Sequence, residues 1–350
     1  MAADPAFAGA IDALCKETFA TPAQACEPLA AGLGSRCFFR VTLGRAPWRV
    51  IARCERAEDP SLRPAGVPGE PPLEPIRAHL EQAGLPVPRR YGARDGVTLL
   101  EDLGDDTLES CVHTTLPQER KRLYGLACEL VPLLQRLDGN PSRVTNFARK
   151  LDRPLFAYKA DQVCRWLIPE LSGCATTPAQ RDVVNAAFDT VAAHALAAPQ
   201  RLAHRDFKAQ NLHVTGRASG SERVSMIDLQ GAFLAPPEYD LVCLLRDLHV
   251  PLPAAEVKRY RERTRPKLPD APARADFDQR FDLLTLSRAG KDTSRFLYAV
   301  QERGDHRYRE FIPTGVRYVR DAAANTAALH PTLDRFHALI EELSEAPCAR

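Results

Sequence analysis

The chain has 350 residues, of which 45% are hydrophobic and 26% are charged. This is the composition of an ordinary globular protein that is long enough for two lobes or domains. The formal net charge of only +2 excludes an overall field that would favour nucleic acid or an anionic membrane, so neither partner is expected.

The N-terminal sequence and the cysteine spacing indicate the cellular compartment. Residues 1–20 lack the basic start and unbroken apolar core of a signal peptide, and no stretch approaches the roughly eighteen apolar residues of a membrane span. The ten cysteines occur without any Cys-x-x-Cys pair, which favours reduced structural thiols over zinc ligation. We therefore expect a cytoplasmic protein.

The first fifty residues predict two helices and a hairpin. Residues 5–20 have the apolar spacing of an amphipathic helix. Thr21-Pro22-Ala23-Gln24 combines a capping hydroxyl, an early proline and a glutamine, which is typical of a second helix start. Residues 37–43 and 48–54 are rich in β-branched and aromatic side chains and are joined by a short Gly- and Pro-containing turn, which indicates a β-hairpin.

A proline-rich connector then leads into a helix and a strand. Residues 57–75 contain six prolines, which is typical of a loop. Residues 73–83 carry an apolar face and stop at a glycine, as a short helix does. Residues 97–104 form an apolar run that ends in an acidic turn. Residues 1–104 are therefore expected to form a small N-terminal lobe that contains a sheet.

From residue 105 to residue 350 the pattern becomes mainly helical. Leucines repeat at helical spacing between residues 123 and 137, which predicts a core-facing stripe. Further helices are expected at residues 155–169, 179–197, 238–248, 254–264, 276–303, 306–328 and 331–344, and two short strands at 212–215 and 224–228. The predicted fold class is α+β, with a small sheet lobe followed by a larger helical lobe.

One polar stretch inside the helical part carries the chemistry. His204 to Asn211 contains an imidazole, a carboxylate at Asp206, an ammonium and a carboxamide, and Asp228 ends an apolar run 17 residues later. A carboxylate that accepts a hydroxyl proton, followed by two oxygen ligands for a hard cation, is what phosphoryl transfer from a nucleotide to an alcohol requires. The alternative is that each residue serves local structure, as a turn cap or a strand end.

At these residues the chain resembles the aminoglycoside phosphotransferase/choline kinase family, whose fold is similar to that of protein kinases. The resemblance covers roughly residues 30–325 and rests on His-x-Asp-x-x-x-x-Asn and Ile-Asp. It implies ATP as co-substrate, Asp206 as the catalytic base and Lys208 near the transferred phosphate. It also implies Asn211 and Asp228 as ligands of Mg²⁺.

The same resemblance implies a nucleotide site. Its residues are Gly32, Gly34, Ser35, Arg53, Glu101 and Leu103. The first three belong to a loop that covers the phosphates, and Arg53 stands where the family has a phosphate-pairing cation. Glu74 is one candidate partner for that cation. The last two belong to the hinge between the lobes, which offers backbone groups to adenine.

A narrower resemblance is to the bacterial anomeric kinases of N-acetylmuramate and N-acetylglucosamine, which act in cell-wall recycling. It rests on the segments Leu99 to Asp105, Ile227 to Ala232, Tyr239-Asp240-Leu241 and Ser287-Arg288-Ala289-Gly290-Lys291. It implies an amino-sugar acceptor. Substrate-contacting residues are then expected at Gln230, Arg288 and Lys291. Gly231 is a departure, because that group usually has an aspartate there.

Several alternatives remain open from the sequence. One alternative is that the acceptor is an aminoglycoside or another small alcohol. A second alternative is that the chain is a catalytically silent kinase-like protein that binds a nucleotide. Arg288 and Lys291 lie three residues apart, so a solvated cationic helix face explains them as well as a substrate does. Asp240, at a helix start, is expected to anchor the catalytic loop. The sequence leaves the oligomeric state open.

Overall fold

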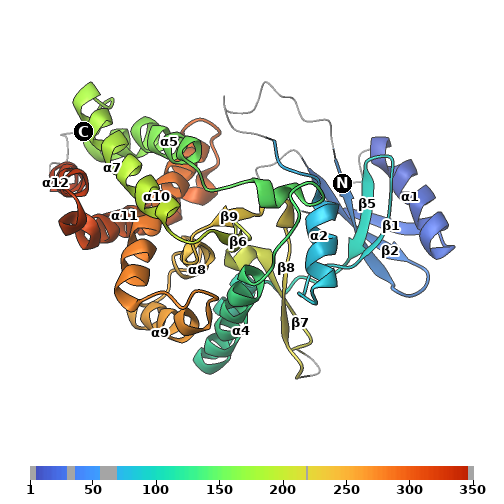
Figure 1. Cartoon of the computed structure of the whole chain (residues 1–350). Coiled ribbons are helices and arrows are strands. Elements are labelled where there is room, and N and C mark those ends of the chain that lie inside the picture. The colour runs from blue at the N-terminus through green and yellow to red at the C-terminus, as the bar shows by residue number, and fades with distance from the viewer. Residues whose placement is uncertain (1–4, 30–35, 56–68, 218–219, 346–350) are drawn as a thin grey trace. The chain divides into compact units, whose positions relative to one another are not determined.

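The computed structural model describes residues 5–29, 36–55, 69–217 and 220–345 (Figure 1). The predicted phosphate-loop residues Gly32, Gly34 and Ser35 lie outside these ranges. The chain divides into two compact units. The first comprises Met1–Ala65, Pro86–Asp106 and His213–Ile227, and the second comprises Gly66–Leu85, Thr107–Leu212 and Asp228–Arg350.

These units are discontinuous in sequence, whereas a single boundary after residue 104 was expected. Residues 213–227 belong to the first unit because the Val214 amide donates to the Asp106 carbonyl and the Met226 amide donates to the Pro86 carbonyl. Helix α2 (Leu73–Gln82) belongs to the second unit, where it packs against the turn at Leu229–Gly231.

The first unit is built on a five-stranded antiparallel sheet in the order β1-β2-β3-β5-β4. Its strands are β1 (Ala23–Pro28), β2 (Cys37–Leu43), β3 (Arg49–Cys54), β4 (Arg90–Arg94) and β5 (Val97–Glu101). Helix α1 (Pro5–Phe19) lies along this sheet (Figure 1). Alternate residues of β2 point inward, as the two-residue period of a strand requires, and pack with the buried residues of α1. The core comprises Ile11, Leu14, Cys15, Phe39, Val41, Leu43, Val50, Ala52, Cys54, Val97 and Leu99.

The prediction that a second helix starts at Thr21 is wrong. Residues from Ala23 onward form β1, which pairs with β2 and places Cys26 opposite Val41. The Ala23 amide donates to the Asp12 carboxylate of α1 at 3.0 Å. Pairing with an available sheet edge satisfies the backbone of this segment, and such tertiary pairing outweighs a local capping signal. The hairpin of β2 and β3 is confirmed.

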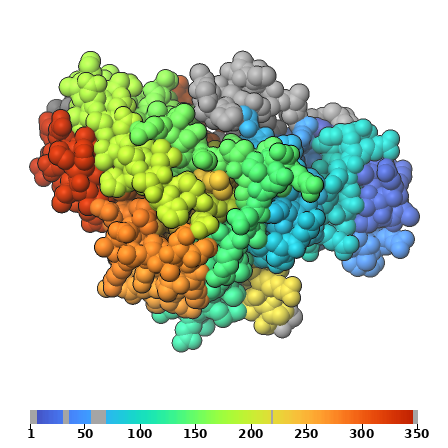
Figure 2. Space-filling model, viewed as in Figure 1, coloured from blue at the N-terminus to red at the C-terminus, as the bar shows by residue number. Residues whose placement is uncertain are grey.

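The second unit is mainly helical, as predicted. Its α-helices are α2, α3 (Leu108–Thr114), α4 (Pro117–Gln135), α5 (Arg153–Gln162), α6 (Ile168–Ser172), α7 (Pro178–Ala197), α8 (Tyr239–Leu245), α9 (Ala254–Thr264), α10 (Arg274–Gln301), α11 (Ile312–Thr326) and α12 (Pro331–Glu345). Helix α10 is the longest and packs against α5, α7, α8 and α11 (Figure 1). Figure 2 shows α9 and α10 in orange and α7 in yellow-green on one face of this unit.

Short strands frame the polar stretch at residues 204–211. Strands β6 (Arg201–Ala203) and β9 (Phe233–Ala235) pair antiparallel, and β7 (Leu212–Thr215) pairs with β8 (Arg223–Met226). The polar stretch therefore runs between the end of β6 and the start of β7. Among the residues that the structure describes, no helix is long and apolar enough to cross a membrane.

Candidate active site

The backbone between β6 and β7 is held by two buried carboxylates. Asp240, at the start of α8, accepts the backbone N–H of His204 at 2.7 Å and that of Arg205 at 3.1 Å. Asp247 accepts the Ala209 N–H at 2.9 Å. Charge-assisted bonds of this kind are about twice as strong as neutral ones. They support the left-handed backbone of Arg205, whose φ is 79°. Asp240 is thus an anchor of this loop, as predicted.

Asp206 is the carboxylate that the loop presents. Its Oδ1 accepts a hydrogen bond from the Arg288 guanidinium at 2.8 Å, and a second guanidinium nitrogen donates to the Arg205 carbonyl at 2.9 Å. Arg288 is only 10% exposed at its side chain, whereas Asp206 is 38% exposed. Arg288 therefore holds the carboxylate on its buried side, and the other side of the carboxylate is accessible to solvent.

Positive charge surrounds Asp206. The Lys208 ammonium lies 3.7 Å from Asp206 Oδ2. Burial acts to raise the pKa of the Asp206 carboxyl, but the charges of Lys208, Arg288 and Lys291 outweigh burial and hold this pKa well below its usual range. The group is therefore a carboxylate at neutral pH, and it can accept a proton or a hydrogen bond from an acceptor hydroxyl.

Asn211 and Asp228 are the two oxygen donors expected to hold a metal ion. The Asn211 amide nitrogen donates to the Asp206 backbone carbonyl at 2.9 Å and to the Asp206 carboxylate at 3.3 Å, which fixes the carboxamide and directs its oxygen elsewhere. Asp228 has a left-handed backbone with φ 62°, a conformation that aspartate tolerates. Among the described residues there is no cluster of three or more His, Cys, Asp or Glu side chains that could hold a metal. A pair of oxygen donors fits Mg²⁺, which keeps several waters and takes further ligands from phosphates.

Gln230 orients Asp228. Its buried amide nitrogen donates to Asp228 Oδ1 at 2.5 Å and to a Glu70 carboxylate oxygen at 3.3 Å. Glu70 also pairs with Arg205 at 3.3 Å. A chain of contacts thus connects Asp228 to the loop that carries Asp206. Gln230, predicted to contact substrate, is bonded to Asp228, which is one of the two predicted metal ligands.

A side chain at position 231 would meet two of the same residues. A Cβ there would lie 3.5 Å from an Arg205 guanidinium nitrogen and 3.7 Å from a Glu70 oxygen. A carboxylate at this position would therefore point toward Arg205. In this chain the carboxylate beside Arg205 comes from Glu70.

Arg288 and Lys291 do not form a solvated cationic face, which was one of the two interpretations of their spacing. Arg288 bonds to Asp206 and also pairs with Asp292 at 3.2 Å. The Lys291 ammonium pairs with Asp292, and its side chain is largely covered. Both cations therefore belong to the charged network around Asp206.

Of the residues predicted to bind nucleotide, the structure describes Arg53, Glu101 and Leu103, which belong to the first unit. Arg53, on β3, pairs with Glu55 at 2.5 Å. Glu74, the candidate partner, pairs with Arg77 at 2.8 Å. Glu101 ends β5 and accepts the Arg89 N–H at 3.1 Å, and Leu103 follows outside the strand.

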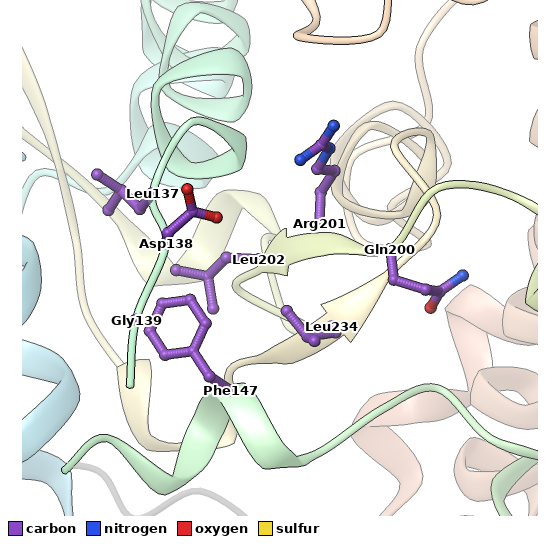
Figure 3. A pocket seen from close by; sticks show the side chains of 8 residues that line it. All are labelled: Leu137, Asp138, Gly139, Phe147, Gln200, Arg201, Leu202 and Leu234. Carbon is purple, nitrogen blue, oxygen red and sulfur yellow. The ribbon is translucent and has the colours of Figure 1, made fainter. Parts of the chain in front are cut away.

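The second unit also has a hollow that none of the predicted site residues lines. It has a volume of about 190 Å³ and is lined by Leu137, Asp138, Gly139, Phe147, Gln200, Arg201, Leu202 and Leu234 (Figure 3). Ligand pockets are usually 300–1,000 Å³, so this hollow is too small for an acceptor sugar. Arg201 at its rim is paired with Asp270 at 2.6 Å.

Sequence reasoning missed several charged residues that pair with or lie near Arg288 and Arg205. Asp292 lies four residues after Arg288, a spacing that signals an ion pair on a helix. Lys159 follows Phe156 on the buried face of α5. A lysine at a position of the apolar stripe could have indicated a buried amine. Glu70 lies in the proline-rich connector, where no pattern indicates its contact with Arg205.

Comparisons with known proteins bear on the family and the fold of the chain. Residues 25–277 match the sequence model of the Phosphotransferase enzyme family. The N-acetylmuramate/N-acetylglucosamine kinase of Neisseria meningitidis serogroup B is 28% identical over 253 residues, which cover 71% of this chain and 72% of that protein. The enzyme of the same name from Pseudomonas aeruginosa is 28% identical over 265 residues, covering 74% of this chain and 75% of that protein.

Solved structures show the same fold at low sequence identity. The gentamicin complex of APH(2'')-IIa is 14% identical, covers 96% of this chain and 99% of that chain, and has a TM-score of 0.59. The choline kinase LicA from Streptococcus pneumoniae is 14% identical, covers 90% of this chain and 96% of that chain, and has a TM-score of 0.54. The predicted protein-kinase-like fold is thus confirmed. The chain belongs to the Phosphotransferase enzyme family and is a kinase that phosphorylates a hydroxyl acceptor.

Proposed function

We propose that this kinase transfers the terminal phosphoryl group of ATP to the anomeric hydroxyl of N-acetylmuramate or N-acetylglucosamine. The observation that carries the proposal is the ionised, partly exposed Asp206 carboxylate clamped by Arg288 at 2.8 Å. The acceptor identity is supported by the two bacterial kinases that share 28% identity with most of the chain.

In this proposal Asp206 orients the acceptor hydroxyl and takes its proton as the phosphoryl group transfers. General-base help of this kind contributes roughly 10²–10⁴ in rate. Lys208 lies beside Asp206 and is suited to stabilise negative charge on the transferring group. Both residues are held by the same anchored loop, so their geometry is set before substrate arrives.

Asn211 and Asp228 are the residues that would hold Mg²⁺. When bound, this ion neutralises the charge on the nucleotide phosphates. The contribution of the chain is to fix the two oxygen donors, through the bond from Asn211 to Asp206 and the bond from Gln230 to Asp228.

An aminoglycoside acceptor is the alternative within the same chemistry. Aminoglycosides are polycations, and the described side chains around Asp206 include Lys208, Arg288 and Lys291. Like charges repel the more strongly where solvent is excluded. A neutral or anionic amino sugar suits this setting better than a polycation.

The test is a substrate panel with Mg²⁺-ATP, in which the position of the new phosphate is read by ³¹P and ¹H NMR. The panel contains N-acetylmuramate, N-acetylglucosamine, choline and an aminoglycoside. We expect a phosphate on the anomeric carbon of the two amino sugars. A phosphate at carbon 6, or turnover of the aminoglycoside alone, would refute the proposed acceptor while leaving phosphoryl transfer intact.

A further inference from the structure

Lys159 is a buried lysine that the phosphoryl-transfer chemistry described above does not use. It lies on α5 with 6% of its surface exposed, and its ammonium has no hydrogen-bond partner among the described residues. The nitrogen lies 5.1 Å from the centre of the Phe156 ring and 5.4 Å from that of the Tyr239 ring. Aromatic faces attract a cation but do not replace its hydrogen bonds.

The charges that face Lys159 add to this cost. Helix α10, which packs against α5, presents Arg288 and Lys291 together with the carboxylate of Asp292. Both of those cations already pair with Asp292. Helix α8 contributes Tyr239 and Cys243, whose thiol pKa is raised by burial to well above its usual range. The described side chains therefore leave Lys159 in a setting with surplus positive charge.

This surplus sits beside the catalytic loop. Arg288 connects the surroundings of Lys159 to Asp206, because its guanidinium bonds to Asp206 and also pairs with Asp292. Burial, and then the charges of Lys291 and Arg288, lower the pKa of Lys159 to about 7. An anion that accepts hydrogen bonds from this amine would reverse that shift and relieve the repulsion.

We propose that Lys159 and Lys291 form an anion-binding subsite that receives a carboxylate on the acceptor, beside the hydroxyl that Asp206 activates. This inference rests on the proposed function. It assigns the specificity to a chemical group: N-acetylmuramate carries a lactyl carboxylate, whereas N-acetylglucosamine has a neutral hydroxyl at the same carbon. The nucleotide's terminal phosphate is the competing anion, and the experiment separates the two.

The experiment compares N-acetylmuramate with its methyl ester, in which a small neutral group replaces the carboxylate. We measure kcat/KM for both compounds, and the KM for ATP, with wild type, Lys159→Met, Lys159→Gln and the control Lys258→Met, whose lysine is exposed on α9. A charged hydrogen bond predicts an acid-to-ester preference of about tenfold or more in wild type and in the control. The preference is expected to fall to about one in both Lys159 variants.

The wild-type protein supplies a reading that needs no variant. The acid-to-ester preference is expected to decline from pH 7 to pH 9 as Lys159 loses its proton. A preference that stays constant over this range, or acid and ester rates that fall by the same factor in both Lys159 variants, would overturn the subsite. A rise in the KM for ATP alone would assign the cluster to the nucleotide phosphate instead.

Failure of the proposed function has a different signature. If wild type phosphorylates neither amino sugar, that function is refuted, and the subsite is then tested with inorganic sulfate. We expect sulfate to raise the melting temperature of wild type and of Lys258→Met more than that of Lys159→Met. Equal stabilisation of all three proteins would overturn the anion site.

Discussion

Replacing Lys159 with methionine is expected to stabilise the ligand-free protein. Methionine keeps the length and packing of the lysine stem on α5 but removes an amine that is 6% exposed and has no hydrogen-bond partner among the described residues. The sign follows from the pKa, which folding lowers from an ordinary 10.5 to about 7. Protonation is then less favourable in the folded chain than in the unfolded chain, so the amine costs stability at low pH.

The size of this cost depends on pH. Below pH 7 the amine is charged in both states and the full cost applies. The cost declines as pH rises from 7 toward 10.5, because the folded protein no longer has to hold the charge. With these pKa values the cost is about 4–5 kcal/mol at pH 6 and about 2 kcal/mol at pH 9. These are upper figures, since the variant relaxes around the new side chain.

The assay is urea unfolding followed by far-UV circular dichroism at pH 6 and pH 9. We expect Lys159→Met to raise the free energy of unfolding, and to raise it by about 2–3 kcal/mol more at pH 6 than at pH 9. Lys258→Met, which removes an exposed lysine, controls for the loss of one charge. A Lys159→Met variant that is destabilised equally at both pH values would show that the ammonium has a partner and would refute the reasoning.

Three further substitutions test the geometry around the loop. Arg288→Met removes the clamp on Asp206 and is expected to lower kcat about 10²-fold in a coupled ATP assay while the KM for ATP stays within twofold; a change confined to KM would contradict this. Asp240→Ala leaves two buried N–H groups without their acceptor, so thermal unfolding should show a loss of about 2–4 kcal/mol, and an unchanged melting temperature would argue against the anchor. Asp228→Asn is expected to raise the Mg²⁺ concentration for half-maximal rate at least tenfold, because removing a ligand's charge costs no less than the roughly 10–100-fold lost when a ligand's outer partner is mutated; an unaltered Mg²⁺ titration would remove Asp228 from the metal site.

The sequence indicated the loop and its chemistry because these depend on residues close together in the chain. Asp206, Lys208 and Asn211 fall within six positions, and the contacts of Asn211 with Asp206 need only a short turn. The long helices were also predictable, since their apolar spacing is strong. Asp240 could be assigned as an anchor from its place at a helix start.

What the sequence could not supply were contacts between distant segments. Thr21 and Gln24 have the pattern of a helix start, yet Ala23–Pro28 form a strand that pairs with the edge of β2. Glu70 reaches Arg205 across 135 positions, and no local pattern reports such a pairing. Arg288 and Lys291 could be placed on one helix face, but only the fold decides that this face is covered by the catalytic loop and α5.

The central claim is that Asp206 activates an acceptor hydroxyl for phosphoryl transfer. Its most direct test is the rate of ³¹P-detected sugar phosphate formation by wild type, Asp206→Asn and the control Asp189→Asn, whose carboxylate is exposed on α7. We predict that Asp206→Asn forms product at least 10²-fold more slowly while its affinity for ATP, measured by calorimetry, stays within threefold, and that the control matches wild type. An Asp206→Asn variant that phosphorylates the sugar at a rate within tenfold of wild type would contradict the claim.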